Sequence, residues 1–202
     1  MCSRLPTVHD LLPRRGNRFT RWLGRTILAA LGWRVQGRPP DQARMVLIGA
    51  PHTSNWDFVV ALATAFALGL EIHWLGKHTL FRPPVGPLMR WLGGIPVDRR
   101  VRSGVVSQSV EAIRSRDQML LCIAPEGTRG RVRRWKTGFY HIARETGLPI
   151  LLCHLNNPRR ILGFGPTFRP GNDTDADLAA IRAHYERFRG RRGVRETDTG
   201  ES

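Results

Sequence analysis

Short apolar runs alternate along the chain with longer segments in which apolar residues recur every three or four positions. The short runs have the length of buried strands, and the longer spacing is typical of helices packed on a core. We expect strands at 45–49, 72–75, 119–124 and 150–154. We expect helices at 17–31, 55–68, 86–92, 103–115, 138–146 and 174–189. The alternation predicts a single α/β domain with a mostly parallel or mixed central sheet flanked by helices.

The segment 1–40 differs from the rest of the chain. It contains one acid, Asp10, and arginines at positions 4, 14, 15, 18, 21, 25, 34 and 38. Within it, Phe19 and Trp22 join four aliphatic residues at helical spacing. A short basic amphipathic N-terminal helix with aromatic residues is typical of a membrane-interface element. An ordinary surface helix docked on the core explains the same pattern.

The prolines at 39 and 40 predict a boundary. We therefore divide the chain into a basic amphipathic segment over 1–40, a main domain over 41–190, and a polar, disordered tail over 191–202.

The net charge of the 202-residue chain is +16, from 32 basic and 16 acidic residues. Such a surface attracts nucleic acid, anionic lipid headgroups or phosphorylated substrates. Only Lys77 and Lys136 are lysines, and the planar fork of arginine suits phosphate oxygens. A coding bias toward arginine explains the same composition.

The chain has three cysteines, no CxxC pair and no secretory signal pattern, so we expect a reducing, cytoplasmic environment. The longest apolar stretch, 58–70, has roughly 13 residues, whereas a membrane span needs about 20. We expect no bilayer crossing.

His52 and Asp57 form the first candidate motif, after a predicted strand. The imidazole can accept a proton near neutral pH, and a nearby carboxylate can fix its tautomer. Asp57 has a second explanation, because Ser54-x-x-Asp57 has the spacing of a helix capping box. No G-x-S-x-G elbow supplies a separate nucleophile, and a direct attack by a substrate hydroxyl would need only the base. His73 and His78 show no H-E-x-x-H pattern, and we expect no metal.

The second candidate motif is Glu126-Gly127-Thr128-Arg129, at the end of the predicted strand 119–124. Arg129 can bind a phosphate bidentately, Gly127 permits close backbone approach, and Glu126 can accept hydrogen bonds from a hydroxyl. A strand-end turn with a surface ion pair is the alternative. Further candidate anion contacts are Arg99, Lys77 and Lys136. Trp135, beside an arginine run, indicates an interface.

These motifs resemble those of the glycerophospholipid acyltransferases, in particular the 1-acyl-glycerol-3-phosphate acyltransferase group. His52–Asp57 is similar to the family's H-x4-D motif, and Glu126–Arg129 to its E-G-T-R motif. The segments 94–99 and 148–150 resemble the second and fourth family motifs, and all four occur in the family's order. Gly130 stands where the family usually has serine. The segment 41–190 is accordingly identified as an acyltransferase domain.

The resemblance implies an O-acyltransferase that moves a fatty acyl group from acyl-CoA or acyl carrier protein to a lysophospholipid hydroxyl. The expected acceptor is 1-acyl-glycerol-3-phosphate, which gives phosphatidic acid. His52 would deprotonate the acceptor, Asp57 would hold His52, and Glu126 would orient the glycerol portion. Arg99 and Arg129 would bind the phosphate, and no cofactor is needed.

Two alternatives stay open. One is acyl transfer to another lyso-lipid, such as a lyso-aminolipid, and the other is a basic nucleic-acid-binding protein. For the enzyme we expect an anionic membrane surface as partner, no nucleic acid, and peripheral (monotopic) attachment to the inner face of the cytoplasmic membrane.

Overall fold

The computed structural model describes residues 5–51, 54–97, 102–126, 135–186 and 188. The predicted tail over 191–202 lies outside the described residues. The strands are β1 (Arg34–Gln36), β2 (Arg44–Ala50), β3 (Ile72–Lys77), β4 (Gly94–Val97), β5 (Met119–Ile123), β6 (Ile150–Asn156) and β7 (Ile161–Phe168). The helices are α1 (Arg18–Ala30), α2 (Asn55–Leu68), the 3-10 helix η1 (His78–Phe81), α3 (Gly86–Trp91), α4 (Arg102–Arg114), α5 (Gly138–Thr146) and α6 (Thr174–Glu186).

The seven strands form one sheet in the order β1-β7-β6-β2-β5-β3-β4. All neighbouring pairs are parallel except β6 and β7, which are antiparallel. The predicted α/β class, the mixed sheet and the basic helix near the N-terminus are confirmed. The sequence did not predict β1, β4 or β7.

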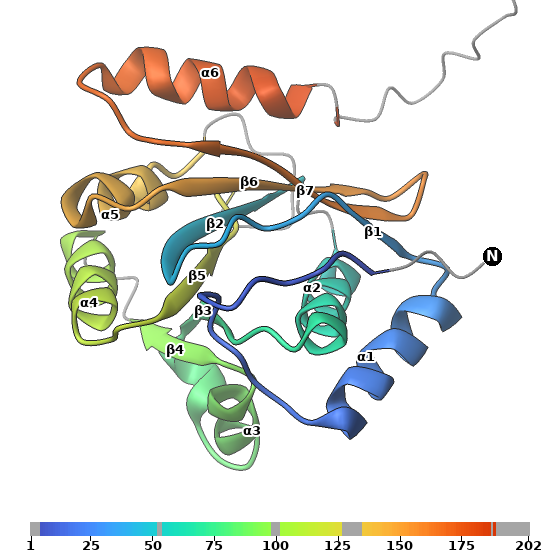
Figure 1. Cartoon of the computed structure of the whole chain (residues 1–202). Helices are drawn as coiled ribbons and strands as arrows, with labels where there is room; N and C mark the ends of the chain where they lie inside the picture. Colours follow the sequence, from blue (N-terminus) through green and yellow to red (C-terminus); the bar gives the residue numbers. More distant parts are fainter. Residues whose placement is uncertain (1–4, 52–53, 98–101, 127–134, 187, 189–202) are drawn as a thin grey trace, which may run out of the picture.

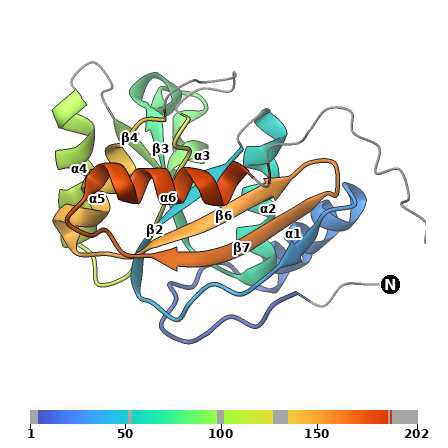
Figure 2. The same cartoon turned by 90° about the horizontal axis from the view of Figure 1, so that it is seen from above.

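Helices cover both faces of the sheet (Figure 1). Helices α4, α5 and α6 lie on one face, and α1, α2 and α3 lie on the other. Viewed from above, α6 crosses β6 and β2 (Figure 2). The buried Tyr185 of α6 is tied to that face, because its hydroxyl lies 2.9 Å from the carbonyl oxygens of Ile48 and Cys153.

The basic helix α1 packs on α2 through its small residue Gly24. A β-carbon at Gly24 would lie 2.5 Å from the carbonyl oxygen of Ala63, so a larger side chain would separate the two helices. Leu28 of α1 is also buried, and β1 adds a strand at the edge of the sheet. The segment 1–40 therefore shares a core with the rest of the chain, and the division at residue 40 stays a prediction.

Local signals set the bounds of α2 as the sequence predicts. Ser54 is its N-cap, and Gly69 ends it in the left-handed region, at φ +67°. Among the described residues, no helix is both long enough and apolar enough to cross a membrane.

Candidate active site

The carboxyl ends of the parallel strands bring the two candidate motifs to one edge of the sheet. Ile48 of β2 pairs with Ile123 of β5, and Ala50 of β2 pairs with His154 of β6. The segments that follow β2 and β5 therefore start side by side. Ligands in open α/β sheets commonly bind at this edge.

Of the two candidate residues in the first motif, Asp57 is the one that the structure describes. It lies in the first turn of α2 and is 3% exposed. Its Oδ2 accepts a hydrogen bond from the Ser54 backbone N–H at 2.8 Å, and its Oδ1 lies 3.4 Å from the donating Ser54 Oγ. The capping role predicted from the spacing is confirmed. The same contacts fix a carboxylate four positions after Thr53, the end of the His52–Thr53 segment.

Asn157 is a contact of Asp57 that the sequence analysis missed. Its Nδ2 donates to Oδ1 of Asp57 at 3.5 Å, from the turn that follows β6. The two residues are 100 positions apart, and the parallel pairing of β2 with β6 brings them together. A polar residue just after the carboxyl end of a parallel strand is the signal that could have indicated it.

The second motif begins at the same edge. Glu126 is half-buried just after β5. The Lys136 backbone N–H donates to the Pro125 carbonyl at 2.8 Å, so the two ends of the intervening segment are held together. The side chains of Lys77, the last residue of β3, and Lys136 are exposed. Both lysines thus lie at the carboxyl edge.

Several predicted site residues lie outside the described part of the chain. They are His52, Arg99, Gly127, Thr128 and Arg129. Their roles, and the joint site that they would form with Asp57 and Glu126, stay predictions.

Trp135 does not form the predicted interface. It is 9% exposed and packs edge-on against Tyr185, with the ring centroids 5.2 Å apart. The arginines before it in the sequence suggested a surface position, but its indole fills the core beneath α6.

His154 is a second histidine near this edge. It stacks on Phe188 with ring centroids 3.8 Å apart and an interplanar angle of 12°. Burial, and then the neighbouring His184, lower the pKa of His154, so its imidazole stays neutral at pH 7. A neutral imidazole can accept a proton. Tests of His52 as the base therefore need His154 as a comparison.

Three comparisons place the chain among known proteins. A profile of the Acyltransferase family matches residues 33–155. The 1-acyl-sn-glycerol-3-phosphate acyltransferases of Limnanthes douglasii and Limnanthes alba are each 29% identical over 147 residues, which is 68% of this chain and 50% of theirs. The chain thus spans about half the length of these plant relatives.

The fold is also similar to the crystal structure of the 1-acyl-sn-glycerophosphate acyltransferase PlsC from Thermotoga maritima. The TM-score is 0.62 at 15% identity, over 88% of this chain and 81% of that one, which supports the fold alone. Because the family profile matches more than half of the residues, the chain belongs to the acyltransferase family.

Proposed function

We propose that the protein is an O-acyltransferase that transfers a fatty acyl group from an acyl thioester to the hydroxyl of a lysophospholipid, with 1-acyl-glycerol-3-phosphate as acceptor and phosphatidic acid as product. The observation that carries the proposal is the buried, hydrogen-bonded carboxylate of Asp57 at the carboxyl edge, in a chain of the acyltransferase family. The names of the two plant relatives support the acceptor.

In the proposed reaction, His52 removes the proton of the acceptor hydroxyl as its oxygen attacks the thioester carbonyl. A C–O bond forms, the C–S bond breaks, and the leaving thiolate takes the proton from His52. Asp57 orients the imidazole and stabilises its cation. The donor is acyl-CoA or acyl carrier protein, and no metal or cofactor takes part.

The remaining predicted residues bind the acceptor in this proposal. Arg99 and Arg129 hold the phosphate, and Glu126 accepts a hydrogen bond from the glycerol portion. Gly127 allows close approach of the backbone, and Thr128 supplies a hydroxyl. Lys77 and Lys136 add positive charge at the same edge, where their exposed ammonium groups can reach a ligand.

The test is product analysis with purified protein. Labelled acyl-CoA or acyl carrier protein is incubated with a panel of lysolipids that includes lysophosphatidic acid and a lyso-aminolipid, and the product is identified by mass spectrometry. We expect phosphatidic acid, no product with His52→Ala, and retained activity with His154→Gln. A product made only from the lyso-aminolipid would overturn the acceptor. Normal activity of His52→Ala would overturn the mechanism, and loss with His154→Gln alone would transfer the role of base to His154.

We further propose that α1 attaches the enzyme to the inner face of the cytoplasmic membrane. The helix docks on α2 through one side, while Phe19 and Trp22 are 64% and 58% exposed on the other. Arg18 and Arg25 are exposed on the same helix, so aromatic and cationic groups face solvent together. Such a surface suits the interface of an anionic bilayer.

Sedimentation with phosphatidylglycerol vesicles tests the attachment. We expect Phe19→Ser together with Trp22→Ser to release the protein, because both side chains are exposed and the folded core is untouched. Leu11→Ser is the matched control, since Leu11 is 55% exposed outside the helix. Equal binding of the double variant and the control would place the attachment elsewhere.

A further inference from the structure

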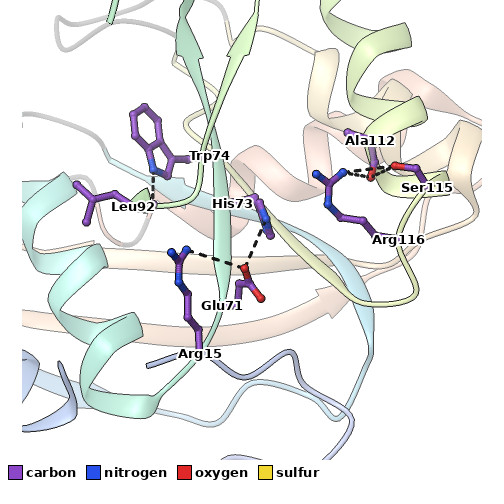
Figure 3. Close-up of polar contacts among 8 residues, drawn as sticks. All are labelled: Arg15, Glu71, His73, Trp74, Leu92, Ala112, Ser115 and Arg116. Atoms are coloured by element: carbon purple, nitrogen blue, oxygen red, sulfur yellow. Dashed lines mark hydrogen bonds and ion pairs between the residues drawn. The ribbon is translucent and has the colours of Figure 1, made fainter. Parts of the chain in front are cut away.

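A cationic cleft of about 390 Å³ lies toward the amino ends of β3 and β4. It is lined by Arg15, Glu71, His73, Arg90 and Arg116, together with residues 93–96. The residues come from five places in the chain: the segment before α1, the start of β3, α3, β4 and the segment after α4. Figure 3 shows Arg15, Glu71, His73 and Arg116 of this group.

On β3 the lining of the cleft lies away from the carboxyl edge, whereas on β4 it extends to Pro96, the residue before the end of that strand. His73 precedes Lys77, the last residue of β3, by four positions, which at about 3.3 Å per residue is a separation of about 13 Å along the strand. The predicted catalytic residues follow the carboxyl ends of the strands. A ligand in this cleft would therefore occupy a second site.

Positive charge exceeds negative charge among the lining side chains. Among the lining residues that the structure describes, three guanidinium groups face one carboxylate, that of Glu71. Nη1 of Arg15 and Nε2 of His73 each lie 3.9 Å from Oε1 of Glu71, which is beyond hydrogen-bond distance. One carboxylate at this distance cannot neutralise three cations, so the cleft keeps an excess of positive charge.

The guanidinium groups are positioned by uncharged partners. Nη1 of Arg90 donates to the Phe81 carbonyl at 3.2 Å, and Nη1 of Arg116 donates to the Ala112 carbonyl at 2.7 Å. Arg15 lies over the ring of Trp91, with 5.4 Å from Cζ to the centroid. A guanidinium has five N–H donors. These contacts therefore fix the groups in place and leave most of their donors for a ligand.

His73 adds a neutral polar group to the cleft. Burial lowers its pKa, and the pull of Glu71 in the other direction is opposed by Arg116 and Arg15. Its Nδ1 is buried and has no hydrogen-bond partner within the part of the chain that the structure describes. The buried Nδ1 cannot be touched from the cleft, so His73 contributes a neutral lining surface whose ring signal would report a ligand bound beside it.

We propose that this cleft binds a phosphate group. Three preoriented arginines supply planar donor forks that match phosphate oxygens, and the cleft has the size of a site for a small phosphorylated molecule or lipid headgroup. The proposal requires nothing of the chemistry at the carboxyl edge, since none of the predicted catalytic residues lines the cleft.

The phosphate can come from a soluble molecule or from a lipid headgroup. Trp91, which lies under Arg15, is 50% exposed, and the neighbouring Leu88 on α3 is 51% exposed. Exposed apolar groups next to the cations would contact the bilayer interface if the ligand were a lipid. A soluble phosphate needs no such contact, so the two sources are separable by experiment.

The first experiment is a titration of the full chain with inorganic phosphate, followed through the NMR signals of the histidine rings. We expect a saturable shift of the His73 signal. Arg90→Gln together with Arg116→Gln should weaken binding at least tenfold, because two of the three cations are lost. The matched control is Arg114→Gln, at the last residue of α4. The side chain of Arg114 is 62% exposed, and its Nη2 lies 3.9 Å from Oε1 of Glu145, away from the cleft.

Unchanged binding in the control supports the proposal, as does unchanged binding in His52→Ala, which removes the proposed catalytic base only. No saturable shift at His73, or an equal loss in Arg114→Gln and in the double variant, would overturn it. Repeating the comparison with vesicles of phosphatidic acid against phosphatidylcholine separates the sources. If the double variant loses more affinity for phosphatidic acid vesicles than for free phosphate, the ligand is a lipid headgroup. If it loses more affinity for free phosphate, the ligand is a soluble molecule.

Discussion

Replacing Asp57 by asparagine separates its helix-capping role from its proposed role in orienting a catalytic base. The substitution keeps the shape of the side chain and removes its charge. The contacts that described residues donate to the carboxylate include the Ser54 N–H at 2.8 Å, the Ser54 hydroxyl at 3.4 Å and the Asn157 amide at 3.5 Å. The amide oxygen of the new residue can keep the shortest of them. The hydroxyl of Ser54 and the amide of Asn157 can both rotate to accept from the new NH₂ group.

The expected cost in stability is therefore modest. What is lost is the charge-assisted part of the hydrogen bonds, together with some of the cap, or about 1–2 kcal/mol. For a domain of this size, that corresponds to a fall of about 2–8 °C in Tm. The expected loss of activity is much larger, about 10³–10⁴-fold in kcat, because an amide at this position cannot stabilise the imidazolium and can select the wrong tautomer.

Steady-state kinetics with acyl-CoA and lysophosphatidic acid, together with thermal melts followed by circular dichroism, measure the two effects. Ser54→Ala is the matched control, since it removes the 3.4 Å contact and leaves the carboxylate in place. We expect this control to lose about 1 kcal/mol of stability and less than tenfold of activity. If Asp57→Asn also lost less than tenfold in kcat, the carboxylate would serve as a helix cap and no more.

Three further predictions concern the fold that supports the site. Gly24→Val should lower the free energy of unfolding by about 1–3 kcal/mol, because its β-carbon would lie 2.5 Å from backbone atoms of α2. Gly138→Ala is the control and should change it by no more than about 0.5 kcal/mol, since the nearest atom would be 3.9 Å away. Equal urea midpoints of the two variants would refute this. Burial raises the pKa of Cys122 to about 11 and that of Cys153 well above its ordinary value, so both thiols are protonated at pH 8. They should react with a thiol reagent only after denaturation, and rapid labelling of the native protein would contradict this. Tyr185→Phe should destabilise the protein by about 1–2 kcal/mol in urea unfolding, because its hydroxyl bridges β2 and β6, and an unchanged midpoint would show that the bridge contributes nothing.

Where several local signals coincide, the sequence predicted the elements closely. The helix α2 has a capping residue, an apolar body and a terminal glycine, and its bounds are those expected. The strand β4 was missed because Pro96 and the glycines before it read as a turn. Proline is tolerated there, since β4 is the last of the described strands in the sheet and no described strand pairs with its outer edge. The three-residue strand β1 is too short to give a pattern.

The candidate site was predictable only where its residues are close in sequence. The pair of Ser54 and Asp57 could be predicted because a capping box is a local motif. The contact from Asn157 depends on the pairing of two strands whose register no local pattern specifies. Trp135 shows the opposite error, since its arginine-rich neighbourhood in sequence says nothing of the core that it packs against.

The two lysines bear on the cause of the arginine excess. A coding bias would replace lysine by arginine wherever either residue serves, and it leaves only Lys77 and Lys136 among 32 basic residues. Both lie at the carboxyl edge, at the end of β3 and beside Pro125 after β5. In the cleft toward the amino ends of β3 and β4, by contrast, the described long cationic side chains are those of arginines. Lysine carries a compact, mobile charge on a flexible stem, whereas arginine presents a fixed fork. Bias and function are therefore compatible: a bias would account for the arginines spread over the surface, and under the proposed function the two lysines stand at the edge where a ligand would need a cation that can move with it.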